Sequence, residues 1–162
     1  MAEEATGNKS VVVVRIRGTI RARREARETL RLLHLTRNNY AALIDNRPSF
    51  SGMLKAVRGY VTWGEASQES VNMLIKKRGR LLGSKKLTGE YLQKNGFKTI
   101  EELAEAVFAC RIEYWKLRNI QPAFRLRPPT KGFKRNIKKG YGADGELGYR
   151  SQKINELIKR MV

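Results

Sequence analysis

Apolar residues between positions 11 and 64 follow strand spacing and helix spacing in turn. Residues 11–17, Val-Val-Val-Val-Arg-Ile-Arg, begin as a continuous β-branched run, which predicts a buried strand that ends in basic residues. The next apolar positions recur on one helix face: Ala22, Ala26, Leu30 and Leu33. Arginines 24, 27 and 31 fall on a stripe well away from that face. The pattern therefore predicts a strand followed by a helix with one apolar side and one cationic side.

The same alternation continues to residue 64. Residues 40–44 have strand composition and end at the turn cluster 45–48. A second helix is predicted to begin at an N-cap, Ser49 or Ser51, and to stop at Gly59. Its apolar positions have i, i+3, i+4, i+7 spacing: Phe50, Met53, Leu54 and Val57. With a short strand at 60–63, the stretch predicts a β-α-β-α-β core whose two helices cover one sheet face.

Helical patterns also follow the core. A helix that starts at Ser67 is predicted to end in the basic run 76–80, and a short helix is predicted at 90–94. Residues 99–102, Thr-Ile-Glu-Glu, fit a capping box that opens another helix. Residues 122–148 contain Pro and Gly with little periodicity, which predicts an extended or looped segment.

These patterns divide the chain into five segments, the last of them a short helix capped by Ser151 that docks on the body. We expect a disordered lead (1–10), the β-α-β-α-β core (11–64), a helical extension (65–119), a basic extended loop (120–150) and a docking helix (151–162).

The net charge of the chain says most about its partners. The sequence holds 34 Lys plus Arg against 15 Asp plus Glu, a formal net charge of +19. Such an excess repels itself in a compact state, so it favours a polyanionic partner, and nucleic acid is the obvious one. An anionic membrane surface also fits the positive sign of the net charge. Apolar runs such as 11–14 are far shorter than the roughly 20 residues that span a bilayer, and no signal peptide is visible. An intracellular protein without membrane insertion is expected.

Catalytic and metal-binding patterns are not evident in the sequence. Cys110 and His34 are the only residues of their types, which predicts no disulfide and no zinc site. Cys110 is interpreted as a small buried residue, with a reactive thiol as the alternative, and His34 as structural beside Leu30 and Leu33. The acidic residues are scattered, whereas metal-dependent nucleases cluster theirs. We therefore predict no enzymatic activity, no cofactor, no metal and no small-molecule substrate.

Basic residues form three clusters without acidic neighbours. Residues 15–24 hold five arginines, 76–86 hold six Lys or Arg, and 125–139 hold seven. Arg and Lys gain affinity from phosphates by Coulomb attraction and counterion release, and Arg adds bidentate hydrogen bonds. A single cluster is usually a solvated surface. Three recurring clusters favour contact with nucleic acid.

Aromatic residues are interleaved with the last cluster. Phe124, Phe133 and Tyr141 each lie beside basic residues, where a ring can stack on an unpaired base. Each ring can equally anchor its loop to the core, which is the interpretation we favour for Phe124. The segment is expected to be mobile in water and to become ordered on folded RNA.

One motif is a decoy. Residues 140–145, Gly-Tyr-Gly-Ala-Asp-Gly, match the G-x-G-x-x-G dinucleotide fingerprint. The genuine fingerprint follows a hydrophobic strand and opens a helix, whereas this one follows Asn-Ile-Lys-Lys and leads into Glu-Leu-Gly. We interpret it as a flexible loop.

The order of several short motifs along the chain carries a family resemblance. They include Val12 to Arg17, Thr29 to Asn39, the strand 40–44, Ser51 to Leu54, Tyr60 to Gly64, Pro122 to Pro129, Gly145 to Arg150 and Ile154 to Met161. Together they resemble the large-subunit ribosomal protein family called L-thirty, named L-seven in eukaryotes. Nearly the whole chain is covered, and its length resembles archaeal members. Ser51, where many relatives place a basic residue, and Thr130-Lys131-Gly132, which lacks the paired glycines, depart from the pattern.

The resemblance implies an α+β fold: a small three-stranded antiparallel sheet with two helices on one face, related to ferredoxin-like folds. A helical extension and a basic extended C-terminal segment are added to it. It also implies ribosomal RNA of the large subunit near the 5S RNA, and neighbouring ribosomal proteins, as partners of a cytoplasmic, ribosome-bound protein.

We therefore predict a structural constituent of the large ribosomal subunit that binds and stabilises folded ribosomal RNA. The alternatives are a non-ribosomal RNA chaperone or architectural nucleic-acid-binding protein, and an RNA-processing factor. The predicted RNA-binding residues are Arg15, Arg17, Arg21, Arg24, Arg27, Arg37, Asn38, Asn39, Arg47, Arg125, Arg127, Lys131, Lys134, Arg135, Lys138 and Lys139.

The charge excess predicts a steep salt dependence. For about 6 to 10 phosphate contacts, affinity for RNA falls by about 10³ to 10⁵ between 50 and 200 mM salt, because bound cations release condensed counterions. Fluorescence anisotropy with labelled RNA at several salt concentrations measures this slope. A flat response would contradict every nucleic-acid hypothesis.

Overall fold

A three-stranded antiparallel sheet forms the centre of the molecule, as predicted. The computed structural model describes residues 9–162. Strand β1 (Ser10–Arg15) lies between β2 (Tyr40–Asp45) and β3 (Val61–Glu65), with Val13 opposite Ala42 on one side and Trp63 on the other. Of the predicted lead, residues 1–8 lie outside the described residues, and Ser10 already begins β1.

The sheet is wider than the three strands predicted, and on this point the prediction is wrong. It has six strands in the order β4-β2-β1-β3-β6-β5. The additional strands come from the segment predicted as an extended loop: β4 (Ala123–Arg125), β5 (Asn136–Gly140) and β6 (Gly145–Tyr149). They are three to five residues long, and β5 is exposed along its whole length. Strands this short and polar show no apolar alternation, so the sequence pattern does not reveal them.

Strand β6 is joined to the central sheet by its pairing with β3 and by a buried arginine, Arg150. It runs parallel to β3, and Arg150, directly after it, donates to Thr62 Oγ1 at 2.8 Å and to Glu146 Oε2 at 2.5 Å. Strand β5 pairs with β6 in parallel, with a shifted register. Only the 3₁₀ turn η2 (Tyr141–Ala143) and Asp144 connect the two strands, where parallel pairs usually need a dozen residues or more. A Cβ on Gly145 would lie 2.0 Å from the Lys139 carbonyl oxygen, so this tight connection requires glycine.

Two helices cover one face of the sheet, as predicted. Helices α1 (Arg24–Leu32) and α2 (Pro48–Val57) bury Ala26, Leu30, Leu54 and Val57 against Val11, Val13 and Ile44 of the strands. Helix α2 begins at Pro48, with Arg47 as N-cap, rather than after Ser49 or Ser51. Proline suits the first helical position because its missing N–H would have no partner there and its φ is already helical.

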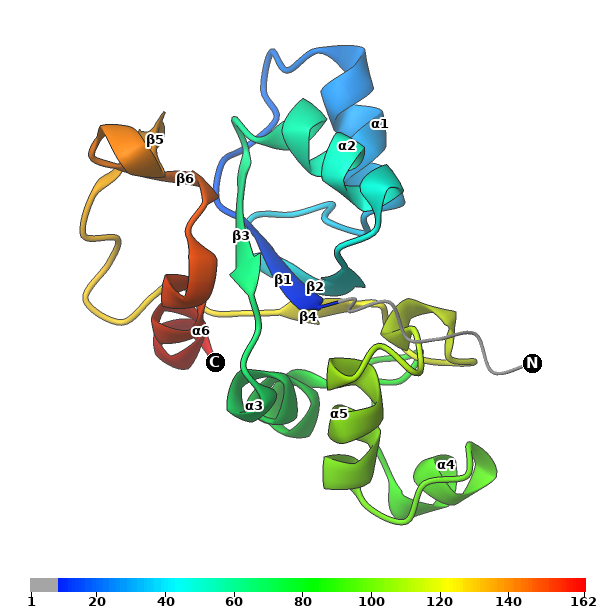
Figure 1. The fold of residues 1–162 in the computed structure, drawn as a ribbon. Coiled ribbons are helices and arrows are strands. Elements are labelled where there is room, and N and C mark those ends of the chain that lie inside the picture. Colours follow the sequence, from blue (N-terminus) through cyan, green and yellow to red (C-terminus); the bar gives the residue numbers. More distant parts are fainter. Residues whose placement is uncertain (1–8) are drawn as a thin grey trace.

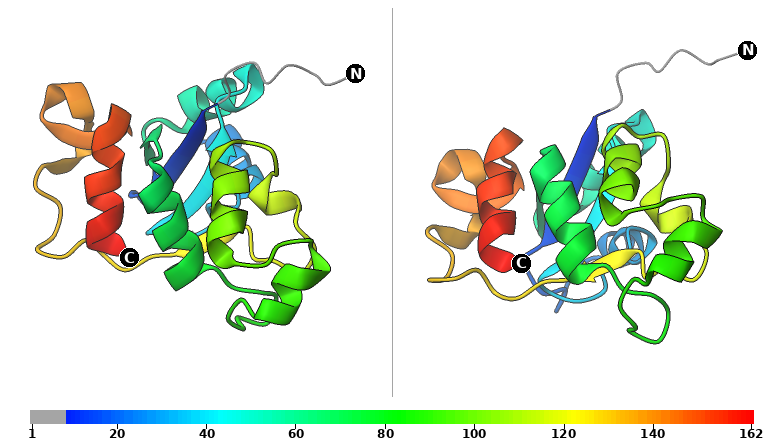
Figure 2. Two further views of the ribbon diagram at one scale, coloured as in Figure 1. Left: turned by 60° about the horizontal axis from the view of Figure 1, so that its bottom comes forward. Right: turned by 90° about the horizontal axis from the view of Figure 1, so that it is seen from below.

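A second helical layer covers the opposite face, which the prediction of helices on one face did not include. Helices α3 (Gln68–Arg78), α5 (Ile100–Phe108) and α6 (Ile154–Met161) lie side by side there, with α4 (Gly89–Lys94) farther out (Figure 2). The predicted caps at Ser67 and Thr99 are confirmed: their hydroxyl oxygens accept from the N–H groups of Ser70 and Glu102, both at 3.2 Å. Burial on both faces explains the unbroken Val11–Val14 run.

The C-terminal helix docks closely on β3. Its four apolar positions, Ile154, Leu157, Ile158 and Met161, are all buried, as predicted. Ser151 is not its N-cap, because the 3₁₀ turn η3 (Ser151–Lys153) comes first and the Ser151 hydroxyl donates to Glu65 Oε2 at 3.4 Å. A Cβ on Gly64 would lie 2.0 Å from the Ser151 carbonyl oxygen, so only glycine allows this approach.

Tyr114 is a buried tyrosine in the 3₁₀ turn η1 (Tyr114–Lys116). Its ring stacks on Phe124 of β4 with centroids 4.8 Å apart, and the side chain is 1% exposed. Within residues 9–162 its hydroxyl has no hydrogen-bond partner. Burial raises the pKa of Tyr114 far above its ordinary value.

We expect Tyr114→Phe to raise the free energy of unfolding by about 1 kcal/mol at pH 7, because it removes a buried hydroxyl that lacks a partner. Above pH 10 the unfolded tyrosine ionises while the buried one stays neutral, so wild type loses stability as pH rises. The advantage of the variant should grow by up to about 1.4 kcal/mol per pH unit there. Urea denaturation at pH 7 and pH 10.5 measures both effects.

Tyr149→Phe is the matched control for removal of a tyrosine hydroxyl, because the Tyr149 side chain is 52% exposed. A loss of more than about 1 kcal/mol for Tyr114→Phe at pH 7 would show that its hydroxyl is hydrogen bonded after all.

Candidate nucleic-acid interface

Loops from separate parts of the chain meet at one end of the sheet, where β1 and β4 end and β2 and β3 begin. The Asn39 N–H donates to the Arg15 carbonyl at 2.8 Å, and the Leu126 N–H donates to the Asn39 carbonyl at 3.1 Å. The N–H groups of Ile16 and Arg17 donate to the Tyr60 carbonyl at 3.0 and 3.1 Å. Backbone bonds therefore hold the loops after β1, before β2, before β3 and after β4 side by side.

These loops carry a set of exposed arginines that we call the basic rim: Arg17, Arg37, Arg58, Arg125 and Arg127. Asn38 is exposed beside them, and Asn39 is half-buried. Arg78, at the end of α3, is also close, since its pKa is lowered by burial and then by repulsion from Arg127 and Arg80. The fold thus brings arginines from all three basic clusters of the sequence close together at one end of the sheet.

The outer face of α1 extends this cationic surface. Arg24, Arg27 and Arg31 are exposed, as the helical stripe predicted, and Arg21 is exposed in the turn before the helix. Arg24 pairs with Glu28 at 2.8 Å, but both side chains are more than half exposed. Exposed ion pairs of this kind contribute about 0–1 kcal/mol. A phosphate can therefore compete for Arg24.

Arg15 does not belong to this exposed surface. Its side chain is 5% exposed and donates to the carbonyls of Leu35 and Arg17, at 2.9 and 3.1 Å, and to the Thr19 hydroxyl at 3.2 Å. Burial lowers the pKa of Arg15. The strand pattern placed Arg15 at an exposed end, but the loops that follow β1 and α1 close over it. We therefore assign Arg15 to holding these loops rather than to RNA.

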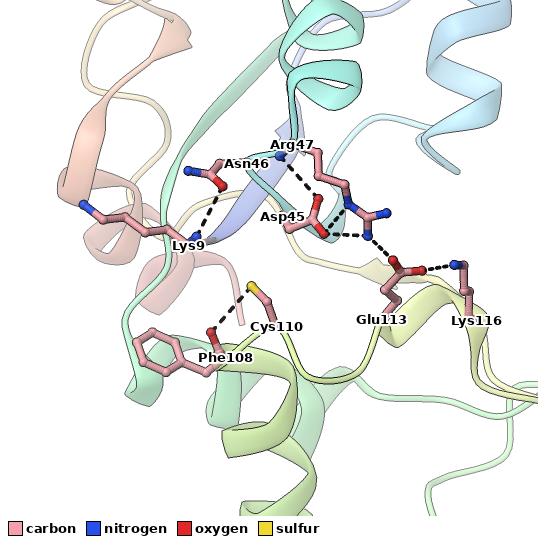
Figure 3. A network of polar contacts seen from close by, with 8 residues as sticks. All are labelled: Lys9, Asp45, Asn46, Arg47, Phe108, Cys110, Glu113 and Lys116. Carbon is pink, nitrogen blue, oxygen red and sulfur yellow. Dashed lines mark hydrogen bonds and ion pairs between the residues drawn. The ribbon is translucent and has the colours of Figure 1, made fainter. Parts of the chain in front are cut away.

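Arg47 is likewise occupied, at the other end of β2. Figure 3 shows its guanidinium between the Asp45 carboxylate, whose Oδ2 it reaches at 2.6 Å, and that of Glu113, which Lys116 also contacts at 2.5 Å. The bond to Asp45 is the main cause of its raised pKa. The six residues of β2 place Arg47 roughly 17–20 Å from the rim. Arg47 therefore links the start of α2 to η1. It lies at the end of β2 opposite the rim.

The C-terminal segment carries further exposed cations. Lys131, Lys134, Lys138 and Lys139 are exposed on the β4–β5 loop and on β5. Arg135 is partly engaged: its guanidinium lies 5.2 Å from the Tyr141 ring centroid and its Nε 3.5 Å from Asp144 Oδ1. Arg160 donates to the Thr130 carbonyl at 2.8 Å and so fixes the loop that presents Lys131.

The aromatic residues divide between core and surface. Phe124 is fully buried, so its interpretation as an anchor is confirmed, and Phe133 is half-buried against the same core. Tyr141 lies between the guanidinium groups of Arg135 and Arg150. Residues 140–145 run from strand to 3₁₀ turn to strand, without the helix that a dinucleotide site requires.

Other single residues play structural or minor parts. Cys110 is partly buried, its Sγ lies 3.8 Å from the Phe108 carbonyl oxygen, and burial raises its pKa (Figure 3). His34 ends α1 in a left-handed conformation, and partial burial lowers its pKa. Within residues 9–162 no cluster of three His, Cys, Asp or Glu side chains is arranged to hold a metal. No helix in the same range is both long and apolar enough to cross a bilayer.

Sequence comparison identifies the family. Residues 11–61 match the family model described as ribosomal protein L30p/L7e. The chain is 44% identical over 152 residues to "Large ribosomal subunit protein uL30" of Thermofilum pendens, covering 93% of this chain and 97% of that protein. The chain belongs to the L30p/L7e family. Relatives of the same description from Nanoarchaeum equitans and Archaeoglobus fulgidus are 42% and 44% identical, covering 93% and 92% of this chain and 97% of each relative.

In this L30p/L7e member, two arginines at or beside the rim were missed by sequence reasoning. Arg58 lies in the turn between α2 and β3, and Arg80 lies close to Arg78 beyond the end of α3. Arg58 stood alone among apolar helix positions and carried no cluster signal. Arg80 belonged to a recognised cluster, but sequence spacing does not show that this cluster folds against Arg127.

Substitutions of Arg15 and Arg17, at the end of β1, should have opposite effects on stability and on RNA affinity. Arg15→Met should lower the free energy of unfolding by about 2–3 kcal/mol, because it leaves two loop carbonyls without their charged donor. Arg17→Met should change it by less than about 1 kcal/mol, since Arg17 is exposed and lies 6.0 Å from the Tyr60 ring. Urea denaturation followed by circular dichroism measures both values.

RNA affinity should show the reverse order at a temperature where both variants are folded. Arg17→Met should weaken binding while Arg15→Met leaves it near wild type. Equal losses of affinity would contradict the assignment of Arg15 to loop support.

Proposed function

We propose that this protein is a structural constituent of the large ribosomal subunit, where it binds and stabilises folded ribosomal RNA. The observation that carries the proposal is similarity over more than nine tenths of the chain to proteins described as large ribosomal subunit protein uL30, joined to a basic rim built from separate loops. The partners that follow are large-subunit ribosomal RNA and neighbouring ribosomal proteins, at the ribosome in the cytoplasm. The family resemblance favours a position near the 5S RNA.

The mechanism we propose is electrostatic bracing. The rim arginines project from loops that are hydrogen bonded to one another, so their spacing is fixed before RNA binds. Phosphates of adjacent RNA helices that match this spacing gain charge-assisted hydrogen bonds without an ordering cost in the protein. The protein thereby favours one RNA fold by binding it more tightly than its alternatives.

The predicted contacts outside Arg15 and Arg47 remain in the proposal. They form two groups: the rim with the outer face of α1, and the exposed cations of the C-terminal segment. Because the chain folds both groups onto one sheet, they can hold two RNA segments at a fixed distance. A free RNA chaperone, which must release its RNA, gains nothing from such a rigid array.

Association with the ribosome should depend on the rim. Tagged wild-type protein in the cells that produce it should cosediment with large subunits on a sucrose gradient at physiological salt. Arg125→Glu/Arg127→Glu should shift it toward free fractions and lower the slope of log affinity against log salt by about 2. Lys94→Glu/Lys98→Glu, the same charge change on the exposed side chains around α4, is the matched control.

Cosedimentation of the rim variant at the wild-type level would exclude the rim as the RNA interface. Wild-type protein found only in free fractions would exclude the ribosomal role and favour the chaperone or architectural alternative.

A further inference from the structure

A groove of about 490 Å³ opens beside the basic rim. It lies where the β5–β6 pair stands next to β3 and the C-terminal end of α2 (Figure 1). Its cationic side chains are Arg17, Lys55, Arg58 and Lys138, and its rings are Trp63, Tyr141 and Tyr149. Of the described residues that line it, none carries a carboxylate. This combination of cations and rings has two possible ligand groups, phosphate and a planar base.

The rings are held in place before any ligand arrives. Tyr141 lies between Arg135 and Arg150, with guanidinium carbons 5.2 and 5.1 Å from its ring centroid. Tyr149 is 52% exposed, and its hydroxyl donates to Glu65 Oε1 at 2.9 Å. Trp63 stands opposite Tyr149 in the β3–β6 register and is half-buried. Rings fixed in this way can stack on a ligand with little loss of side-chain entropy.

We propose that this groove binds a single-stranded RNA segment, with an unpaired base stacked on Trp63 or Tyr149 and the flanking phosphates on its four cations. The proposal rests on the proposed function and specifies one contact within it. Cations alone would accept duplex phosphates or an acidic peptide equally. The rings of Trp63 and Tyr149 within a recess of small-molecule size fit a base that has left its stack, whereas the paired bases of a duplex cannot reach them.

The charges around the groove also limit the path of the strand. A smaller hollow of about 180 Å³ continues from it and shares Lys55, Trp63 and Tyr149. Asp45 and Glu65 line this hollow, which the groove residues Arg17 and Arg58 do not. Carboxylates repel phosphate, so the backbone should stay at the Arg17 and Arg58 side, with the base directed toward Trp63.

Two glycines allow a test that preserves the fold. Gly142 and Gly59 lie on opposite walls of the groove, and a Cβ on either meets no heavy atom of residues 9–162 within 4 Å. Neither has a positive φ. Gly142→Glu and Gly59→Glu each place a carboxylate in the groove. Gly89→Glu, at the start of α4 and equally open, adds the same charge far from it (Figure 1).

The probe is a labelled single strand of about eight uridines, within the usual range of single-strand sites. At physiological salt, Gly142→Glu and Gly59→Glu should each weaken binding about tenfold or more, and Gly89→Glu less than about twofold. Equal effects of all three variants would indicate general electrostatics and overturn the groove proposal.

Tryptophan emission gives a direct readout of stacking. The chain has two tryptophans, and Trp115→Phe leaves Trp63 as the only one while keeping a ring against Phe50. The uridine strand should quench Trp63 emission saturably. An RNA duplex and a poly-glutamate peptide should not. Quenching by the peptide but not by RNA would assign the groove to an acidic protein partner and overturn the proposal.

The two proposals can fail separately. If the protein cosediments with large subunits but the uridine strand leaves Trp63 emission unchanged, the groove proposal fails and the ribosomal role stands. If Trp63 is quenched but the protein never cosediments, the groove binds single-stranded RNA and the ribosomal role fails.

Discussion

Burial of β1 on both faces is the constraint on which the rest of the structure depends. Val11 and Val13 contact α1 and α2, while Val12 and Val14 face the layer of α3, α5 and α6. Fully burying one valine side chain contributes about 1.5–3 kcal/mol, so this strand secures both layers at once. Because β1 is central, its position also fixes β2 and β3, and with them the loops that carry the rim. A cationic interface needs such a support, since the rim arginines repel one another.

Self-repulsion also explains where the few acidic side chains lie. Three of them are used inside the fold: Asp45 and Glu113 hold Arg47, and the buried Glu146 holds Arg150. Helix α5, which carries three more, lies well apart from the β5–β6 pair (Figure 1), and its Glu102 accepts from the Lys98 N–H. The cations that face the rim and the groove are thus left without internal partners strong enough to compete with phosphate.

In the segment 120–150, the backbone attaches the segment to the body, while the lysine side chains stay exposed. Its backbone is bound to the body through β4, through Arg150 and through the Arg160 contacts to the 130–132 loop. Its lysines point outward along β5, where an edge strand rich in lysine also resists pairing with another chain. An ordered backbone with free cations suits permanent attachment to RNA better than transient capture.

The sequence by itself determined the three central strands, the α1 and α2 layer, the caps of α3 and α5 and the cationic character of the protein. Each of these rests on local spacing: β-branched runs, apolar residues every three or four positions, or a Ser or Thr at a helix start. Uncompensated charge is likewise a sum over residues and needs no structure.

Only the tertiary structure decided that Arg15 and Arg47 turn inward, that Arg58 belongs to the rim, and that β4, β5 and β6 widen the sheet. The same residue type, arginine, is buried at 15 and exposed at 17, because loops distant in sequence close over one and leave the other open. Trp63, Tyr141 and Lys55 come from three separate elements, and only long-range strand pairing places them around one groove. Local periodicity cannot encode such long-range contacts, since they depend on which distant backbone groups pair.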